Sequence, residues 1–194
     1  MSPKNEPAID MAKNSKAKSA KQVQKKLQDF GIRGVLVITR DGMPVLVREY
    51  GDPIETTMGD RTLVSAFFSA MAHFADENIS GLLSDIGMHT LRFFFDHTED
   101  LLFLLAVDEV KITLFSTYEL RTLLKATLAE IKIDIIEFFI NKGDSIEDVT
   151  RDPQKFEKAR NELSSIGPSL DKILHKSYLK ALKLLEEEKS SALV

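Results

Sequence analysis

The 194-residue chain contains no cysteine. This absence excludes a disulfide framework, a thiol nucleophile and a zinc site with cysteine ligands, and it fits an intracellular protein. Long hydrophobic runs are also missing. The densest apolar stretch, residues 101–107, is far shorter than the ~20 residues that span a bilayer. No apolar stretch of a secretory signal follows the N-terminal lysines. We therefore expect a soluble, cytoplasmic protein.

Charge is distributed unevenly along the chain. The net charge is −4, but residues 1–26 carry seven lysines against Glu6 and Asp10, so the rest of the chain carries −9. This acidic body argues against a specific nucleic-acid partner. Residues 1–18 are predicted to form a flexible basic tail. The tail either solubilises the chain or makes a weak contact with an anionic membrane surface, which would add a peripheral membrane location.

Apolar periodicity and turn residues predict the secondary structure. Residues 19–30 form a short helix with one narrow apolar stripe, and residues 61–76 and 118–140 form longer helices. Strands are expected at 33–39, 45–50, 90–96 and 101–108, with a weaker one inside 81–88. The segment 110–116 fits either a strand or a helical turn. An acidic linker then leads to two helices, one that starts at Pro153 and ends at Gly167-Pro168, and one at 168–189.

The hairpin at residues 35–50 is apolar on odd and even positions alike, around the turn Asp41-Gly42. A surface hairpin would keep one face polar, so protein must cover both faces here. The strand 101–108 is also apolar on both faces, which places it centrally in the sheet. The fold class is therefore α+β, a five-stranded antiparallel sheet sandwiched by helices, with a C-terminal helical extension.

The stretch "LQDFGIRGVLVITRDGMPVLVREY" resembles the opening of roadblock and longin domains, and the continuation from "RTLVSAFF" to "LLFLLAVDE" is more similar to the longin side. The resemblance covers residues 23–140. It implies a profilin-like α/β/α sandwich that lacks catalytic activity and often dimerises. Such domains dock small Ras-like GTPases or belong to trafficking, coat and tethering complexes. The domain boundaries that follow are 1–18 for the tail, 19–143 for the longin/roadblock-like domain and 144–194 for the extension.

Chemical motifs are few. The cluster "DHTED" at residues 96–100 is the best metal candidate, but a metal site needs ligands that converge from several directions, so we interpret it as a solvated hairpin turn. The sequence has neither a phosphate-binding G-x-x-x-x-G-K-[ST] loop nor a G-x-S-x-G nucleophile elbow. Any of several arginines could act as a finger on a bound GTPase, although such residues are more often in salt bridges. We expect no enzyme activity, no cofactor and no metal.

The predicted function is a protein-interaction module that binds a small Ras-like GTPase, a second copy of itself or a trafficking-type assembly. The hairpin and the helix after it are the predicted interaction surface: Val35, Val37, Val45, Val47, Arg48, Arg61 and Phe68. In the alternative, the C-terminal helices dock in a groove and autoinhibit a self-associating domain through Leu174, Tyr178 and Leu185. A small-ligand sensor is a third hypothesis. The sequence leaves open whether the C-terminal helices pack in cis or in trans.

Overall fold

The computed structural model describes the backbone of residues 7–51, 61–78, 84–113, 118–143 and 145–191. Side chains are described for residues 19–51, 64–73, 84–111, 118–143, 145–187 and 190. None of the helices in these ranges combines the length and the apolar character that crossing a bilayer requires.

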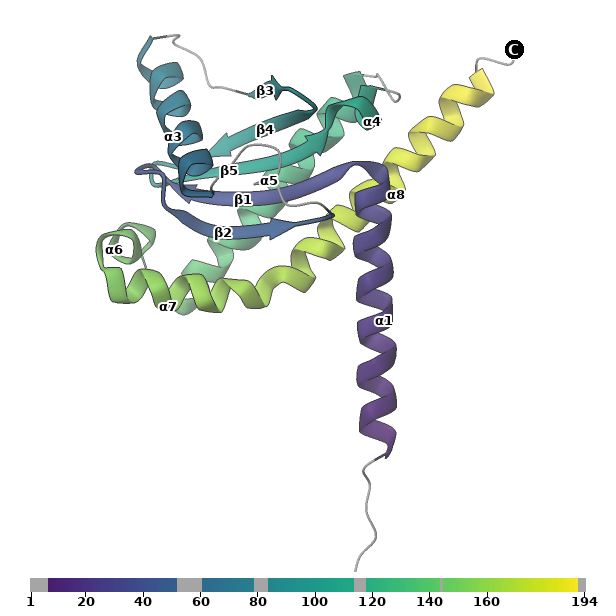
Figure 1. Ribbon diagram of the computed structural model, residues 1–194, viewed down its shortest axis with the longest axis horizontal. Coiled ribbons are helices and arrows are strands. Elements are labelled where there is room, and N and C mark those ends of the chain that lie inside the picture. The colour runs from purple at the N-terminus through teal and green to yellow at the C-terminus, as the bar shows by residue number, and fades with distance from the viewer. Residues whose placement is uncertain (1–6, 52–60, 79–83, 114–117, 144, 192–194) are drawn as a thin grey trace, which may run out of the picture.

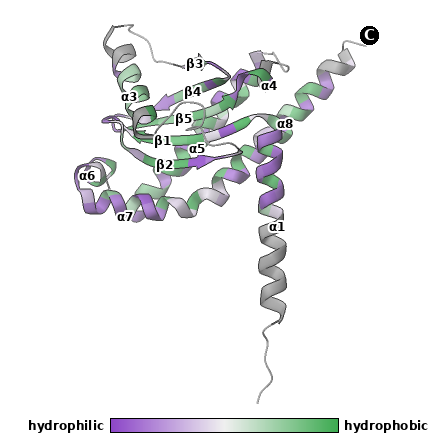
Figure 2. Cartoon of the chain, in the orientation of Figure 1, coloured by the Kyte–Doolittle hydropathy of each residue, from purple (hydrophilic) through white to green (hydrophobic). Residues whose placement is uncertain are grey.

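Five antiparallel strands form one sheet in the order β2-β1-β5-β4-β3 (Figure 1). They are β1 (Ile32–Thr39), β2 (Pro44–Glu49), β3 (Asp85–Met88), β4 (Leu91–His97) and β5 (Leu101–Asp108). The strand predicted to be central, β5, is the middle strand of the sheet, and all eight of its residues are buried. Figure 2 shows that β1 and β5 are largely hydrophobic along their length. Flanked on both sides and covered on both faces, such strands have no face left for polar residues.

Helices lie on both faces of this sheet and extend from it. They are α1 (Pro7–Phe30), α3 (Arg61–Asn78), α4 (Glu109–Thr113), α5 (Tyr118–Lys142), α6 (Ile146–Arg151), α7 (Pro153–Leu163) and α8 (Gly167–Ser191), with a 3₁₀ turn, η1 (Ser164–Ile166), before α8. The structure confirms the α+β sandwich with a C-terminal helical extension. The sequence did not decide whether the segment after β5 is a strand or a helical turn. In the structure this segment begins with helix α4.

The two faces of the sheet bury separate hydrophobic cores. One core lies under α3 and contains Leu36 and Ile38 of β1 and Phe68 of α3. The other core contains Val35 and Val37 of β1 and is closed by α1, α5, α6, α7 and α8. Alternation along β1 therefore sends successive side chains into different cores. This explains why the hairpin is apolar on odd and even positions alike.

A β-bulge adjusts the register of the hairpin. Val37 pairs with Leu46 and Ile38 pairs with Pro44, so Val45 is an extra residue on β2. Because of the bulge, Val45 and Leu46 both lie in the core closed by α5 and α8. The turn itself packs on α3: a Cβ on Gly42 would lie 2.9 Å from the Cα of Ala66. Gly42 also has φ +84°, which favours glycine.

Three boundaries differ from the sequence prediction. Helix α1 begins at Pro7 rather than residue 19, so much of the segment predicted as a tail is helical backbone. The predicted acidic linker contains helix α6, which Glu147 and Asp148 favour as acidic residues in its first turn. Gly167-Pro168 begins α8 as predicted to within one residue, but α7 already ends at Leu163, and the 3₁₀ turn η1 connects the two helices without an extended break. The start of α7 at Pro153 is as predicted, and Asp152 caps it through the amides of Gln154 and Lys155.

Candidate interaction surfaces

Most of the residues predicted to contact a partner lie in the interior. Exposure is 0% for Val35, Val37 and Phe68 and 2% for Val45. Their side chains fill the two cores, so a partner cannot touch them while the domain is folded. This corrects the choice of residues on the predicted surface. Arg61 is the first residue of α3, and its side chain lies outside the described residues.

Val47 is the one predicted aliphatic residue that remains partly exposed. It pairs with Leu36 across the hairpin, so it points to the α3 face of the sheet at the β2 edge. At the opposite edge, Ile86 and Met88 of β3 are also only partly buried against the α3 core. On α3 itself, Phe67 is 41% exposed and stacks edge-on against Phe68. Apolar side chains therefore remain partly open at both margins of the α3 face.

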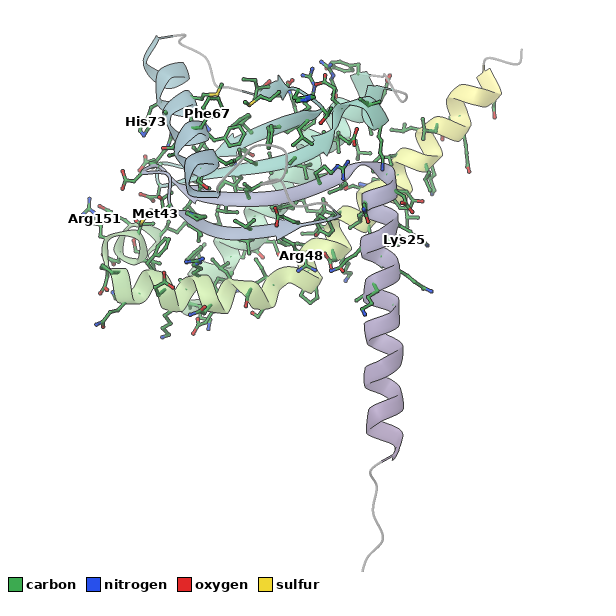
Figure 3. The ribbon with its side chains drawn as sticks, viewed as in Figure 1. Lys25, Met43, Arg48, Phe67, His73 and Arg151 are labelled. Atoms are coloured by element: carbon green, nitrogen blue, oxygen red, sulfur yellow. The ribbon has the colours of Figure 1, made fainter. Side chains whose placement is uncertain are left out.

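The hairpin turn adds exposed groups beside α3. Met43 is 42% exposed. His73 on α3 lies 3.3 Å from the carbonyl oxygen of Arg40, and the hydroxyl of Ser69 donates to the same oxygen. Figure 3 shows Met43, Phe67 and His73 at the α3 end of the molecule. The turn and α3 thus form one fixed unit with exposed apolar groups.

Arg48 is held inside the molecule rather than offered to a partner. Its guanidinium donates from Nε to Asp171 Oδ1 at 2.7 Å and from Nη2 to Oδ2 at 2.5 Å. The hydroxyl of Tyr50 donates to the same Oδ1 at 2.6 Å. Burial, followed by the bond to Asp171, raises the pKa of Tyr50 far above its usual value. We call Arg48, Tyr50 and Asp171 the clasp, because they join β2 and its following residue to α8.

The clasp settles how the C-terminal helices pack. They lie in cis: Leu174 is 1% exposed within the core, and the ring of Tyr178 meets that of Phe30 edge-on at 5.4 Å. The hydroxyl of Thr127 on α5 donates to that of Ser177 at 2.7 Å. Leu185 is half-buried near the end of α8. The residues predicted to dock in a groove therefore form part of one wall of the domain.

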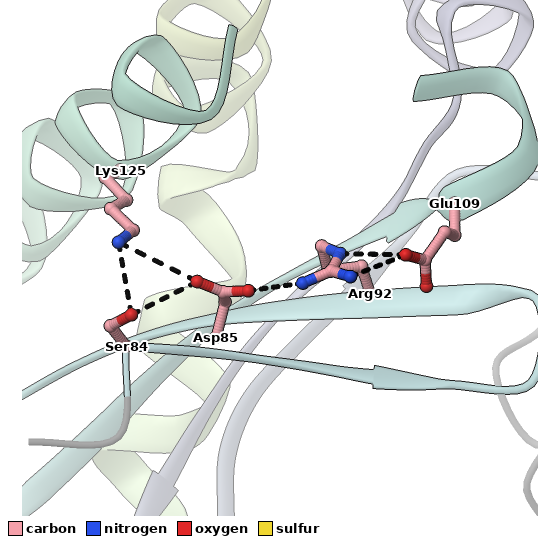
Figure 4. A network of polar contacts seen from close by, with 5 residues as sticks. All are labelled: Ser84, Asp85, Arg92, Glu109 and Lys125. Atoms are coloured by element: carbon pink, nitrogen blue, oxygen red, sulfur yellow. Dashed lines mark hydrogen bonds and ion pairs between the residues drawn. The ribbon is translucent and has the colours of Figure 1, made fainter. Parts of the chain in front are cut away.

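A network of charges occupies the α5 side of the sheet at its β3 edge (Figure 4). Arg92 donates from Nη2 to Glu109 at 2.6 Å and is also bonded to Asp85, while Lys125 donates to Ser84 at 3.1 Å. Burial would raise the pKa of Asp85, but hydrogen bonds from Arg92 and Ser84 and the nearby positive charges outweigh it, so the pKa is lowered. This network fixes the short strand β3 to α4 and α5.

No metal centre is present among the described side chains. No three histidine or carboxylate residues in these ranges come together as a metal site requires. In the "DHTED" turn, Asp96 instead accepts a bond from Lys132 at 2.6 Å. Arg33 and Arg40, two candidate fingers, bond to Asp108 and to the carbonyl oxygens of Thr98 and Glu99. A shallow groove of about 360 Å³ between α5 and α8 is lined mainly by charged residues.

The prediction from the sequence did not select two important residues, Asp171 and Phe67. Asp171 lies among the lysines and leucines of α8, and only its position on the apolar side of the helix could have marked it as a buried carboxylate. The predicted surface included Phe68, which is buried, and passed over its neighbour Phe67, which is 41% exposed. Adjacent residues on a helix are about 100° apart, so the two rings point in different directions, and this signal was available.

Comparison with known proteins yields structural likeness but no sequence relative. No protein-family model and no curated protein match the chain. The gliding protein MglB from Thermus thermophilus is 18% identical, over 49% of this chain and 78% of that one, with a TM-score of 0.34. MglB of Myxococcus xanthus is 12% identical, over 61% and 95%, with a TM-score of 0.40. A chain of the AP-3 complex, from a homology model of its stretched open conformation, is 13% identical, over 82% and 98%, with a TM-score of 0.41.

These values establish no family membership. The five-stranded antiparallel sheet with helices on both faces is itself the architecture that the sequence resemblance to longin and roadblock domains implied. Function has to be argued from the surfaces of this chain.

Proposed function

We propose that this chain is a non-catalytic protein-interaction module whose partner binds the α3 face. The contrast between the two faces of the sheet carries the proposal. The chain closes one face with its own helices, whereas Val47, Phe67 and Met88 remain partly exposed at the other. Partly exposed apolar groups rimmed by polar residues are typical of protein-binding surfaces.

The electrostatics favour a binding module over an enzyme. Arg33, Arg48 and Arg92 each form an ion pair with a carboxylate, with side chains about one-fifth exposed. Groups held in this way position elements of the fold and are not poised for proton or phosphoryl transfer. The α5–α8 groove is lined by carboxylates of α5 and lysines of α8 without a convergent catalytic set.

The expected partner is a small Ras-like GTPase, a second copy of the chain, or a subunit of a trafficking-type assembly. The sequence resemblance to longin and roadblock domains supports these three classes. Binding at the α3 face would place the exposed ring of Phe67 in the interface, where a large aromatic side chain contributes strongly to affinity.

A pair of matched variants tests the proposal. Phe67→Glu puts a charge on the α3 face, and Ile140→Glu makes the same change at a residue of α5 that is 68% exposed. Self-association is measured by light scattering, and binding to the small Ras-like GTPases of the source organism, with GDP or a GTP analogue, by calorimetry. We expect Phe67→Glu to weaken association by about tenfold or more and Ile140→Glu to leave it unchanged.

One outcome would contradict the proposed surface, and another would exclude two of the three partner classes. If both variants associate as the unaltered chain does, the interface lies elsewhere. If the unaltered chain is monomeric and binds none of the GTPases, the first two partner classes fail. Both variants must first show the circular dichroism spectrum of the folded chain.

A further inference from the structure

Helices α5 and α8 run side by side in opposite directions on the face of the sheet away from α3 (Figure 1). The hydroxyl of Thr127 on α5 bonds to that of Ser177 on α8, and Glu130 pairs with Lys176 at 2.9 Å. Residue numbers therefore fall along α8 as they rise along α5. We call the solvent side of these two helices, on either side of the groove between them, the α5–α8 face.

The two walls of the groove carry charges of opposite sign. Glu130, Asp134 and Glu137 of α5 line the groove at spacings of four and three residues. Lys172 and Lys176 of α8 line it at a spacing of four. Residues spaced in this way lie on one side of a helix. The α5 wall is therefore acidic and the α8 wall basic.

Most of these charges have no counter-charge within the described part of the chain. The pair of Lys176 with Glu130 crosses the groove, and its side chains are 55% and 42% exposed. Across the residues that the structure describes, Lys172, Asp134 and Glu137 form no ion pair. The Oδ2 atom of Asp134 is buried and accepts no hydrogen bond there. Charges of both signs on this face thus lack a partner.

Each wall also exposes one large aliphatic side chain. Ile133 is 55% exposed and lies between Glu130 and Glu137 on the groove side of α5. Leu179 is 46% exposed and follows Lys176 by three residues, on the same side of α8. Apolar side chains flanked by charged ones are typical of the contacts between packed helices.

We propose that two copies of the chain pack through their α5–α8 faces, about a two-fold axis parallel to these helices. Such an axis lays α5 of each copy over α8 of the other, and the four helices form an antiparallel bundle. Glu130 and Glu137 of one copy then face the lysines of the second copy's α8. Because Glu130 is level with Lys176 and a helix rises about 1.5 Å per residue, Ile133 lies between the second copy's two lysines, against their aliphatic stems.

The charge pattern selects both the axis and the occupant. A two-fold axis perpendicular to the helices would lay α5 on α5, and the glutamates of the two copies would repel each other. A nucleic acid or an anionic bilayer carries charge of one sign and would be repelled by the acidic wall. A second copy of the chain supplies both signs at the matching positions.

This inference goes beyond the proposed function, because α3 covers the opposite face of the sheet from α5 and α8. The dimer would present two α3 faces, one on each outer side, to the partners proposed above. If the α3 face also binds a copy of the chain, the assembly would be larger, and Phe67→Glu would reduce it to the dimer described here.

Reversal of charge on each wall tests the inference by light scattering of the full chain. Lys172→Glu/Lys176→Glu makes both walls acidic, and Glu130→Lys/Glu137→Lys makes the two outer positions of the α5 wall basic like α8. Each double variant alone should dimerise at least about tenfold more weakly than the unaltered chain. An equal mixture of the two should recover the dimer, because each reversed wall then faces the opposite sign. The dimer of the unaltered chain should also weaken as salt is added.

Two controls separate this interface from effects of net charge and of exposed apolar residues. Lys155→Glu/Lys158→Glu makes the same change of charge at exposed lysines of α7 and should have little effect. Ile133→Glu should weaken the dimer by about tenfold or more. Ile140→Glu alters an exposed isoleucine of α5 that does not line the groove, and it should leave the dimer unchanged.

Three results would overturn the inference. One is an unaltered chain that stays monomeric at millimolar concentration, and another is a mixture of the two charge variants that stays monomeric although both are folded by circular dichroism. The third is a dimer that both charge variants keep and Phe67→Glu loses, which would place the second copy on the α3 face. Because Phe67→Glu should keep the dimer proposed here, failure of this inference and failure of the α3 proposal are separate results.

Discussion

Replacing Asp171 with asparagine removes the negative charge at the centre of the clasp while keeping the shape of the side chain. Arg48 then loses its counter-charge, and the hydroxyl of Tyr50, a residue 1% exposed, loses an ionised acceptor. Breaking a fully buried ion pair costs about 3–5 kcal/mol, and an exposed pair is worth less than about 1 kcal/mol. The side chains of Arg48 and Asp171 are 23% and 10% exposed. We therefore expect Asp171→Asn to lower the free energy of unfolding by about 2–4 kcal/mol.

Equilibrium unfolding in urea, followed by circular dichroism, measures this loss as a lower midpoint with an unchanged slope. Glu157→Gln is the control, because it breaks an ion pair with Arg160 whose carboxylate side is 61% exposed, and it should have little effect. The double variant Arg48→Met/Asp171→Leu should recover much of the loss, since an apolar pair leaves no buried charge unpaired. If Asp171→Asn unfolds at the same midpoint as the unaltered chain, the clasp does not hold α8 to the sheet.

Three further predictions follow from backbone strain, ionisation and core packing. Gly42→Ala should be more destabilising than Gly143→Ala by about 1 kcal/mol or more in urea unfolding, because both glycines have positive φ but only Gly42 lies against Ala66. Because the pKa of Tyr50 is raised in the folded state, the folded chain keeps a proton that the unfolded chain releases above pH 10. The free energy of unfolding should therefore fall as pH rises past 10, and it should fall less steeply in Tyr50→Phe. An equal dependence on pH in both proteins would contradict this reasoning. The chain cut after Gly143 should show no cooperative thermal transition, and a folded truncation that dimerises would prove the C-terminal helices to be a regulator.

Side-chain alternation and turn residues were sufficient to predict most of the sheet from the sequence. The turn at Asp41-Gly42 and the central place of β5 follow from alternation and turn chemistry, and the structure shows both. Helix ends were less predictable. Gly167 reads as a terminator, yet it has helical φ and ψ and joins η1 directly to α8. A glycine is required at this position because a Cβ there would lie 2.5 Å from Nη1 of Arg48. A close approach to a residue 119 positions away leaves no local signal.

The interaction residues were harder to predict for a physical reason. Hydrophobicity marks a residue that is covered by protein, but it does not say whether the cover comes from the same chain. Val35 and Val37 were assigned to a partner because the C-terminal helices had no predicted position. Once those helices lie on the sheet, the same hydrophobicity belongs to the core. Val47 and Phe67, which remain partly exposed, are then the candidates for contact with a partner.

The same packing bears on whether the C-terminal helices could act as a detachable inhibitor. Six large apolar residues of α6, α7 and α8 are buried in the core: Val149, Phe156, Leu163, Leu170, Ile173 and Leu174. At about 1.5–3 kcal/mol each, exposing them would cost about 9–18 kcal/mol, which equals or exceeds the total stability of about 5–15 kcal/mol of an ordinary domain. A partner that displaced these helices would have to supply most of that free energy through its own contacts. The helices therefore act as a permanent layer of the fold, and regulation of this chain is expected at the α3 face, where binding requires no such displacement.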